Sequence, residues 1–315
     1  MKSRNFVTLL HDATGAEKHL CVDLNIDINA LPPVVKKFSH LDDQVFTYVK
    51  GIVEATVSFV AAYRISTACY EKAGLTGRIA IGKIVRYIHE LDSSIIIILD
   101  DKWGGAGDNN QGLVQRAFGD LDVDAVTVGH YTGMEEMKSL LDHTNKGVFV
   151  LCRSNGEGRD EFQGLKIRLS LSSLQELLHP DTHVGELCSQ YGWGSFAPYY
   201  VSYYEYVALR VAHFWNRNGN CGLVVGTTDP RELLGVRTLV GPHLPIFIPD
   251  VKLYSSDIAR LVLGVRGLGS SVFLLNVSSG IVSQGDDFAG VAHCAAEETH
   301  EKIVFAIQHP EVTNL

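Results

Sequence analysis

The chain has 315 residues, of which 46% are hydrophobic and 20% charged, and its formal net charge is −9. This length and balance are typical of a folded protein with a sizeable core and argue against a disordered chain. The acidic charge, without a cluster of basic residues, argues against a nucleic-acid partner or an anionic membrane surface, because phosphate groups select clustered Lys and Arg.

The six cysteines are scattered and form no C-x-x-C pair. This spacing predicts reduced thiols rather than a disulfide framework or a zinc site, so we expect no metal and a reducing intracellular compartment, the cytoplasm or an organellar matrix. The longest apolar runs fall well short of the roughly 20 residues that a membrane-spanning helix needs. We therefore expect no membrane span.

Short apolar runs recur along the chain, each followed by a turn and an amphipathic stretch. Such runs predict strands buried on both faces. Strands alternating with helices indicate a (β/α)8 TIM barrel, with a doubly wound sheet as the next choice. The eight predicted strands are 19–24, 45–50, 95–99, 125–128, 147–152, 222–226, 245–249 and 271–275.

Helical signals lie between these runs. Residues 53–70 carry apolar side chains at helical spacing, and Gly74 follows as the expected end of that helix. Glu135 and Glu136 are placed to form the acidic first turn of another helix. Pro230, after a Thr-Asp pair, predicts a third helix start.

One connection is longer than the others. Residues 154–217 have room for more than one helix and include an aromatic cluster at 191–204. Because the barrel pattern resumes afterwards, we predict a single barrel over 1–315 with an elaborated crossover at about 154–217. The aromatic cluster is expected to form core or an interface rather than a base-stacking platform, given the acidic charge.

The predicted strand 95–99 ends in charged residues and then in glycines. Asp100 and Lys102 are two residues apart on an extended chain, so their side chains point the same way. The carboxyl ends of barrel strands are where chemistry is usually done. The alternative is an ordinary strand that meets water at Asp100, because most strands end in polar residues.

Six segments of the chain carry a family resemblance: LCVDLNID at 20–27, VK at 49–50, LDDKWGG at 99–105, DAVTV at 124–128, GVFVLCR at 147–153 and NGNCGLVVGTT at 218–228. In order and spacing they resemble orotidine 5′-phosphate decarboxylase, in its bacterial-type subgroup, over nearly the whole chain. The resemblance implies a barrel of the ribulose-phosphate-binding type. It also implies decarboxylation of a pyrimidine nucleotide without metal or organic cofactor.

The family's chemistry uses an alternating Lys-Asp-Lys-Asp network. The resemblance places Lys50, Asp100 and Lys102 on its first three members, with Asp100 destabilising the bound carboxylate and Lys102 delivering the proton. Gly105 stands where the second aspartate is expected. The network therefore lacks one charge.

The phosphate region departs from the family as well. The family uses a glycine-rich turn after the seventh strand and an arginine after the eighth. Bulky side chains replace the glycines here, and Asp250 would oppose a point charge from a neighbouring lysine. The residues that fall in this region are Lys252, Ser255, Ser256 and Gly280, the last at the position of the expected arginine.

Other substrate contacts follow from the same resemblance. Asn25 stands where the family has an aspartate that contacts the ribose, and Ser154 and Asn155 begin the loop that recognises the pyrimidine. Either Ser154 or Asn155 could form a hydrogen bond with the amide edge of the pyrimidine ring. Thr127, near the end of the predicted fourth strand, completes the set.

Three hypotheses follow. The first is a decarboxylase-like barrel that has lost catalysis and serves as a structural or protein-interaction subunit, either as a homodimer or within a larger assembly. The second is a divergent decarboxylase of pyrimidine biosynthesis, or a related phosphosugar lyase, that uses Lys50, Asp100 and Lys102. The third is a non-catalytic module that binds a pyrimidine nucleotide. No cofactor is expected in any of them.

Overall fold

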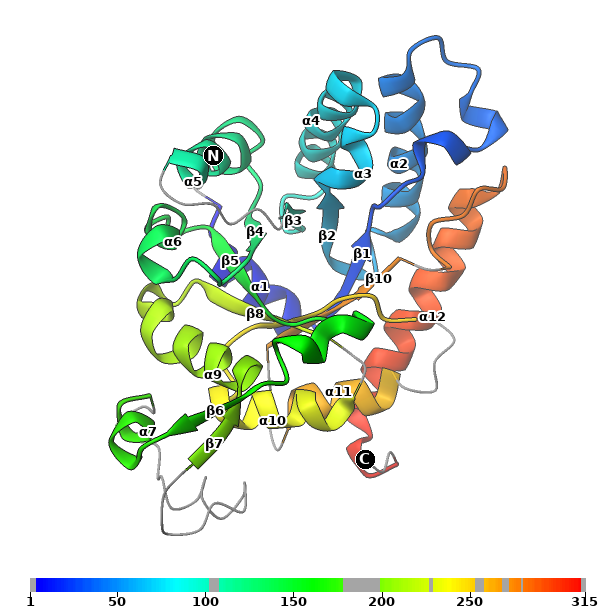
Figure 1. The fold of residues 1–315 in the computed structure, drawn as a ribbon. Coiled ribbons are helices and arrows are strands. Elements are labelled where there is room, and N and C mark those ends of the chain that lie inside the picture. Colours follow the sequence, from blue (N-terminus) through cyan, green and yellow to red (C-terminus); the bar gives the residue numbers. More distant parts are fainter. Residues whose placement is uncertain are drawn as a thin grey trace.

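The computed structural model describes residues 4–101, 108–177, 199–226, 229–252, 258–267, 272–278 and 280–312. Within these ranges eight parallel strands close into a barrel, in the order β1-β10-β9-β8-β5-β4-β3-β2 (Figure 1). They are β1 (Leu20–Asp23), β2 (Val60–Ser66), β3 (Ile96–Asp100), β4 (Ala125–Val128), β5 (Gly147–Arg153), β8 (Cys221–Val225), β9 (Ile246–Ile248) and β10 (Phe273–Val277).

Helices surround the barrel (Figure 1). They are α1 (Phe6–Gly15), α2 (Leu41–Thr56), α3 (Thr67–Glu71), α4 (Gly74–Leu91), α5 (Asp108–Val114), α6 (Met134–Leu141), α7 (Leu171–Leu177), α9 (Tyr203–Arg210), α10 (Pro230–Val240), α11 (Ile258–Arg266) and α12 (Phe288–Gln308). Short 3-10 or π turns occupy Ile28–Ala30, Pro33–Val35, Gln115–Asp120, Glu157–Glu161, Val211–Trp215, Asn216–Asn218 and Pro310–Val312. None of the helices in the described ranges is long and apolar enough to cross a bilayer.

The predicted TIM barrel is confirmed, and seven of the predicted strands overlap barrel strands. The strand predicted at 45–50 is wrong, because these residues belong to α2. Its buried residues recur at intervals of three or four, a helical spacing. They are Val45, Tyr48, Val49, Ile52, Val53 and Thr56.

The second barrel strand lies inside the helix that was predicted at 53–70. All seven residues of β2 are buried, as expected of a strand covered on both faces. Gly74 begins α4 and does not end the preceding helix, so that expectation was also wrong. The predicted helix starts at Glu135 and Pro230 are confirmed by α6 and α10.

The core has two layers that follow the alternation of each strand. Along β3, Ile97 and Leu99 pack outward with the helices, whereas Ile96 and Ile98 belong to a smaller cluster inside the barrel. Helix α1 closes the amino-terminal end of the barrel, because Phe6 belongs to the same inner cluster. Figure 1 shows α1 behind the strands. The carboxyl-terminal end of the barrel is not covered by α1, and the candidate site lies there.

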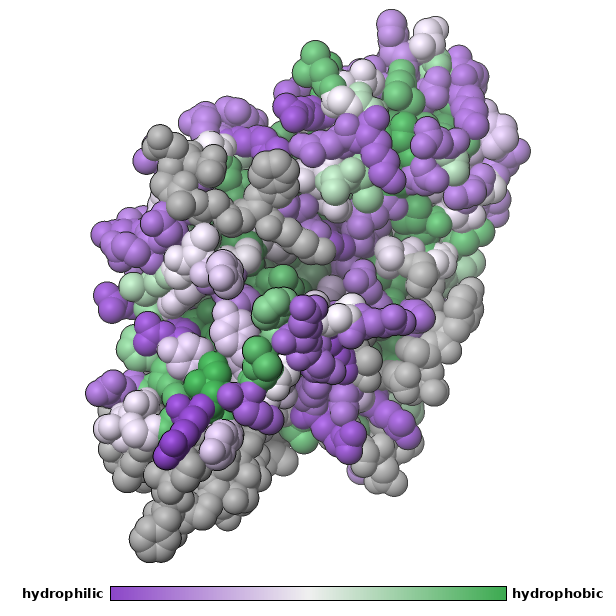
Figure 2. All heavy atoms as spheres, in the orientation of Figure 1, coloured by the Kyte–Doolittle hydropathy of each residue, from purple (hydrophilic) through white to green (hydrophobic). Residues whose placement is uncertain are grey.

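The connection between β5 and β8 contains an antiparallel pair, β6 (Lys166–Leu169) and β7 (Tyr199–Ser202). With α7 and α9 it lies within the predicted crossover at 154–217, and it projects at the lower left of Figure 1. Residues 191–198 of the aromatic cluster lie outside the described residues. Figure 2 shows hydrophobic residues on the surface near β6, where Phe162 and Leu165 are exposed.

Candidate functional site

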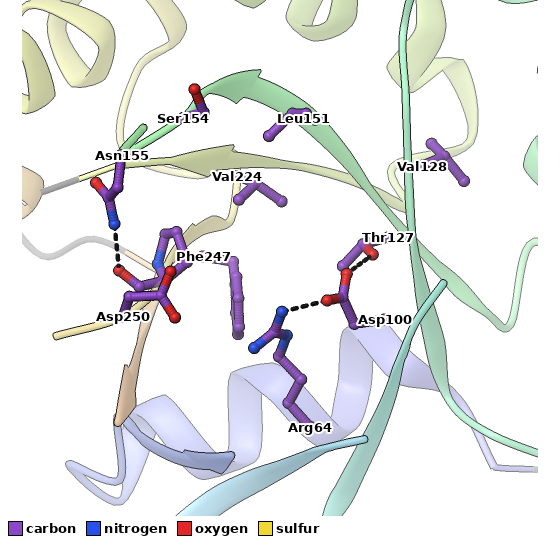
Figure 3. A pocket seen from close by; sticks show the side chains of 11 residues that line it. Arg64, Asp100, Thr127, Val128, Leu151, Ser154, Asn155, Val224, Phe247 and Asp250 are labelled. Atoms are coloured by element: carbon purple, nitrogen blue, oxygen red, sulfur yellow. Dashed lines mark hydrogen bonds and ion pairs between the residues drawn. The ribbon is translucent and has the colours of Figure 1, made fainter. Parts of the chain in front are cut away.

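The carboxyl ends of β2, β3 and β4 bring three polar side chains together. Ser66 of β2 pairs with Asp100 of β3, which in turn pairs with Thr127 of β4. Side chains alternate between the two faces of a strand, so Asp100 lies on the same face of β3 as Ile96 and Ile98, and its side chain points into the barrel. Arg64 of β2 reaches the same place from the neighbouring strand (Figure 3).

Arg64 lies between two carboxylates. Its Nη1 is 2.5 Å from Oδ2 of Asp23 on β1, and its Nη2 forms an ion pair with Oδ2 of Asp100. The Thr127 hydroxyl donates to Oδ1 of Asp100. Each of these four side chains belongs to a residue at most 5% exposed. The result is a buried carboxylate–guanidinium–carboxylate group at the mouth of the barrel.

Burial and charge act in opposite directions on this group. Burial raises the pKa of Asp23 to about 6, although Arg64 lowers it. Burial lowers the pKa of Arg64, but the charges of Asp23 and Asp100 outweigh that effect and hold it above its ordinary value. Arg64 therefore stays protonated, whereas the charge of Asp23 changes around pH 6.

Three polar atoms of the group are buried without a hydrogen-bond partner among the described residues: Oδ1 of Asp23, Nε of Arg64 and Oδ1 of Asn276. Asn276 lies on β10 beside β1, and its amide donates to Asp23 at 3.4 Å. Buried polar groups in proteins bond either to other protein groups or to ordered water, so these three atoms have hydrogen-bonding capacity that the described side chains do not use.

A cavity of about 70 Å³ adjoins the Arg64–Asp100 pair. In Figure 3 Asn155 and Asp250 lie on the side opposite Asp100 and Thr127, with Phe247 between them. The lining residues are Arg64, Asp100, Thr127, Val128, Leu151, Ser154, Asn155, Val224, Phe247, Pro249 and Asp250. Charged and polar groups therefore occupy both ends of a cavity with apolar sides.

The loop predicted to contact a pyrimidine lies on this cavity. The backbone N–H of Ser154 donates to the Gln163 side chain at 2.9 Å, which fixes the first residue of the loop. The Asn155 amide donates to the Pro249 carbonyl at 3.1 Å and so ties the loop after β5 to the segment after β9. Thr127, Ser154 and Asn155 are thus brought together with Asp100.

Lys50 is not brought to this place. It lies on α2, in the outer layer of helices, with its Nζ 3.8 Å from the Glu54 carboxylate and 5.1 Å from the centre of the Tyr87 ring. Among the described residues, Arg64 is a cation that pairs with Asp100. The error has one cause: the strand predicted at 45–50 is a helix, so the basic residue at its end does not face the barrel.

Asp101, next to Asp100, faces the other side of β3. It forms an ion pair with Arg116 and accepts a hydrogen bond from the Thr67 hydroxyl at 2.9 Å. Lys102, Gly105, Ser255 and Ser256 lie outside the described residues. Among the residues that are described, no group of three or more His, Cys, Asp or Glu side chains could hold a metal ion.

The other predicted site residues, Asn25, Lys252 and Gly280, follow the carboxyl ends of β1, β9 and β10. The Asn25 amide donates to Asp23 at 2.9 Å, and its oxygen accepts from the Ser66 N–H at 3.2 Å. Lys252 is exposed and does not line the cavity. Gly280 adopts φ +86°, a left-handed conformation that favours glycine.

Sequence reasoning missed two members of the group, Arg64 and Asp23. The signal for Arg64 was the apolar run VAAYRI at 60–65, which contains a single charged residue and is therefore typical of a buried strand with one functional side chain. Asp23 ends the run LCV in the same way. Arg64 was passed over because the second strand was placed one segment too early, whereas Asp23 lies in the correctly predicted first strand and was not assigned a role.

Comparison with known proteins gives a consistent result. No protein-family model matches the chain. An orotidine 5′-phosphate decarboxylase of Ralstonia nicotianae is 30% identical over 286 residues, which cover 90% of this chain and 92% of that protein. One from Azoarcus sp. is 30% identical over 305 residues, covering 95% and 98%. The solved structure of Leishmania donovani OMP decarboxylase has a TM-score of 0.71 at 27% identity and covers 96% of this chain and 98% of its own.

Proposed function

This chain belongs to the orotidine 5′-phosphate decarboxylase family, and from that premise we propose that it removes the carboxylate of an orotidine-type pyrimidine ring as carbon dioxide. The observation that carries the proposal is the orientation of Asp100. Arg64 and Thr127 hold its carboxylate at the carboxyl end of β3, facing a cavity. A single barrel over the whole chain, assembled as a homodimer, is part of the proposal.

The chemistry is electrostatic. A substrate carboxylate placed against Asp100 is destabilised by the like charge, and this repulsion is relieved when carbon dioxide leaves. The carbon–carbon bond breaks, and its electron pair stays on the ring carbon. Arg64 supplies positive charge beside that carbon, and the Lys102 ammonium delivers the proton that completes the product. Arg64 here takes the place that the resemblance gave to Lys50.

A buried ion pair can also be purely structural. The cavity beside Asp100 favours a functional role for this pair, since a structural ion pair needs no open space next to it.

A second candidate is a barrel without catalysis that serves as an interaction subunit or binds a nucleotide. The observation that favours it is a set of exposed apolar side chains near β6: Phe162 is 65% exposed and Leu165 57%. Exposed apolar surface of this kind is typical of contact sites when it is continuous. Gly105 and Gly280 stand at two positions where the family has charged residues, and this also favours a barrel without catalysis.

The test is decarboxylation of orotidine 5′-phosphate by the purified chain, followed by absorbance, with Asp100→Asn and Asp101→Asn compared. Asp101→Asn is the matched control, because it removes the neighbouring carboxylate on the outer face of β3. We expect Asp100→Asn to lose at least about 100-fold in kcat/KM and the control to retain activity. Circular dichroism checks that both variants are folded.

The other outcomes separate the candidates. Binding of uridine 5′-monophosphate without turnover, measured by calorimetry, would support a nucleotide-binding module. Absence of both turnover and binding would support the interaction subunit, and would contradict the decarboxylase proposal.

A further inference from the structure

Asp23 and Asp100 bind different nitrogens of the Arg64 guanidinium. Oδ2 of Asp23 accepts hydrogen bonds from Arg64 at 2.5 Å and from the Asn25 amide at 2.9 Å. The Asn276 amide donates to the same oxygen at 3.4 Å. Donors from β2, from the segment after β1 and from β10 therefore hold this carboxylate, so its place beside Arg64 is a feature of the fold.

Asp23 does not line the cavity of the candidate site. The residue is 1% exposed, whereas Arg64 and Asp100 both line the cavity (Figure 3). Its carboxylate reaches a molecule in the cavity only through Arg64. Any role of Asp23 in the reaction is therefore one of positioning and charge, not of contact with the substrate.

The charge of Asp23 decides how far Arg64 compensates Asp100. One guanidinium and two ionised carboxylates give the three side chains a net charge of −1, and protonation of Asp23 brings it to 0. In the first state Arg64 is shared between two acids. In the second its charge pairs with Asp100 alone. The difference is one unit of charge whatever other charged groups lie nearby, and a buried setting screens it weakly.

The surroundings of Asp23 place this change in an accessible pH range. Burial raises the pKa of Asp23 to about 6, and the charges of Asp100 and Asp250 act in the same direction, whereas Arg64 and the Asn276 hydrogen bond lower it. Three further groups, on β1 and α3, lie within electrostatic reach of Asp23, and burial raises the pKa of each, so they stay uncharged around pH 6. They are Cys21, Cys69 and Tyr70.

We propose that Asp23 is a positioning residue whose negative charge holds Arg64 between two acids and so keeps the charge of Asp100 available against the substrate carboxylate. The inference rests on the proposed function and goes beyond it by giving a role to a residue outside the cavity wall. Protonation of Asp23 lets Arg64 neutralise Asp100. That weakens the repulsion which the departure of carbon dioxide relieves.

Asp23→Asn tests the proposal, because it keeps the shape and an acceptor for Arg64 but carries no charge. At pH 8 we expect kcat for orotidine 5′-phosphate to fall at least about tenfold while KM stays the same or falls, since ground-state repulsion is removed. Wild-type kcat should fall below about pH 6, and the variant should lack this fall. The substrate phosphate titrates in the same range, but it is common to both proteins.

Asp124→Asn is the matched control. Asp124 is also 1% exposed, and its two carboxylate oxygens accept from Arg4 at 2.8 Å, just before β4 at the amino-terminal end of the barrel. The substitution weakens a buried arginine–aspartate pair of the same kind, away from the candidate site. Its kcat per folded molecule and its pH profile should match wild type, with circular dichroism measuring the folded fraction.

A second variant serves if Asp23→Asn does not fold. Asn276→Leu removes a donor to Asp23, and Oδ1 of Asn276 has no hydrogen-bond partner among the described residues, so the substitution loses one long hydrogen bond. The ionised Asp23 carboxylate then has less support. The fall in kcat should therefore move to higher pH, by about 0.3–1 pH unit.

Binding separates this inference from the proposed function. In the Lys102→Ala background, where turnover is expected to be slow, calorimetry compares orotidine 5′-phosphate with uridine 5′-monophosphate, which lacks the carboxylate. Adding Asp23→Asn at pH 8 should improve the affinity ratio for the carboxylated ligand roughly tenfold, because less negative charge faces that carboxylate.

Three results would each overturn the inference: an Asp23→Asn variant with the kcat and pH profile of Asp124→Asn, an unchanged affinity ratio, or an Asn276→Leu profile that coincides with wild type. Turnover by wild type leaves the proposed function standing in all three. Absence of turnover by wild type contradicts the proposed function, while the affinity ratio still decides the inference. Absence of binding by both ligands contradicts the inference as well.

Discussion

Arg64 is the residue on which the charges of the site depend. Its guanidinium is buried between carboxylates from two flanking strands, β1 and β3. Burying three charged groups is costly, and the arrangement is stable only while the positive charge separates the two negative ones. Removing either carboxylate leaves one ion pair, whereas removing Arg64 leaves two acids facing each other.

Arg64→Met is therefore expected to lower the free energy of unfolding by about 3–5 kcal/mol at pH 7, because it removes the positive charge that lies between the buried carboxylates of Asp23 and Asp100. Arg64→Lys keeps the charge and should cost clearly less. Urea unfolding followed by circular dichroism measures both. A methionine variant as stable as wild type would mean that the group is not held together by charge.

Asp23 gives the site a pH dependence. Its pKa is raised by burial from 3.8 to about 6, so between these values the folded chain binds a proton more tightly than the unfolded chain does. The contribution of Asp23 to stability therefore falls as the pH rises from about 4 to about 6. Above that window it is constant.

Asp23→Asn removes this titration. The difference in unfolding free energy, variant minus wild type, should rise between pH 4 and pH 6 and become level above pH 7. Urea unfolding at pH 4, 5, 6, 7 and 8 measures the difference. A flat difference across the whole range would show that Asp23 titrates normally in the folded chain.

For single residues, the sequence predicted the orientation of the Asp100 side chain correctly but did not predict Arg64 as its ion-pair partner. The alternation of β3 is enough to predict that Asp100 points inward and Asp101 outward, and both are confirmed. The identity of the cation could not be found in the same way. It depends on which segment forms the neighbouring strand, a question that local patterns do not settle.

Helix α4 passes close to the backbone of α3 at Gly77. An added Cβ on Gly77 of α4 would lie 1.9 Å from the Tyr70 carbonyl oxygen of α3, which is backbone and cannot move aside alone. Gly82, on the same helix, has nothing within 4 Å of such a Cβ. The two glycines therefore test packing and helix propensity separately.

Gly77→Ala is expected to destabilise the chain by at least about 2 kcal/mol, because α4 must shift away from α3. Gly82→Ala should stabilise it by about 0.5–1 kcal/mol, since alanine is the better helix former. Thermal and urea unfolding of the pair measure both changes. Equal effects of the two substitutions would contradict the packing described here.

Element by element, the apolar runs predicted seven strands because those strands are covered on both faces. The failure at 45–50 has a physical reason: Val45, Tyr48 and Val49 form a short apolar run and also lie on one face of a helix. Length decides between the two, since the apolar spacing continues to Val53. As a result, β2 was not predicted, because its residues fell within the helix predicted at 53–70.

On the scale of the whole molecule, the two ends of the barrel differ in chemistry. The amino-terminal end is closed by α1, whose Phe6 ring meets the Phe149 ring edge-on at 5.6 Å. The carboxyl end carries the charged group of Asp23, Arg64 and Asp100 and the cavity that adjoins it. Active sites of barrels of this class usually lie at the carboxyl ends of the strands, which is where the proposed site is placed.

Decarboxylation at the charged strand ends is tested by release of labelled carbon dioxide from orotidine 5′-phosphate labelled at the carboxylate, comparing wild type with Lys102→Ala. We expect release by wild type and a loss of at least about 100-fold in the variant, which lacks the proposed proton donor. Release by wild type that does not exceed that of Lys102→Ala would contradict the proposed function.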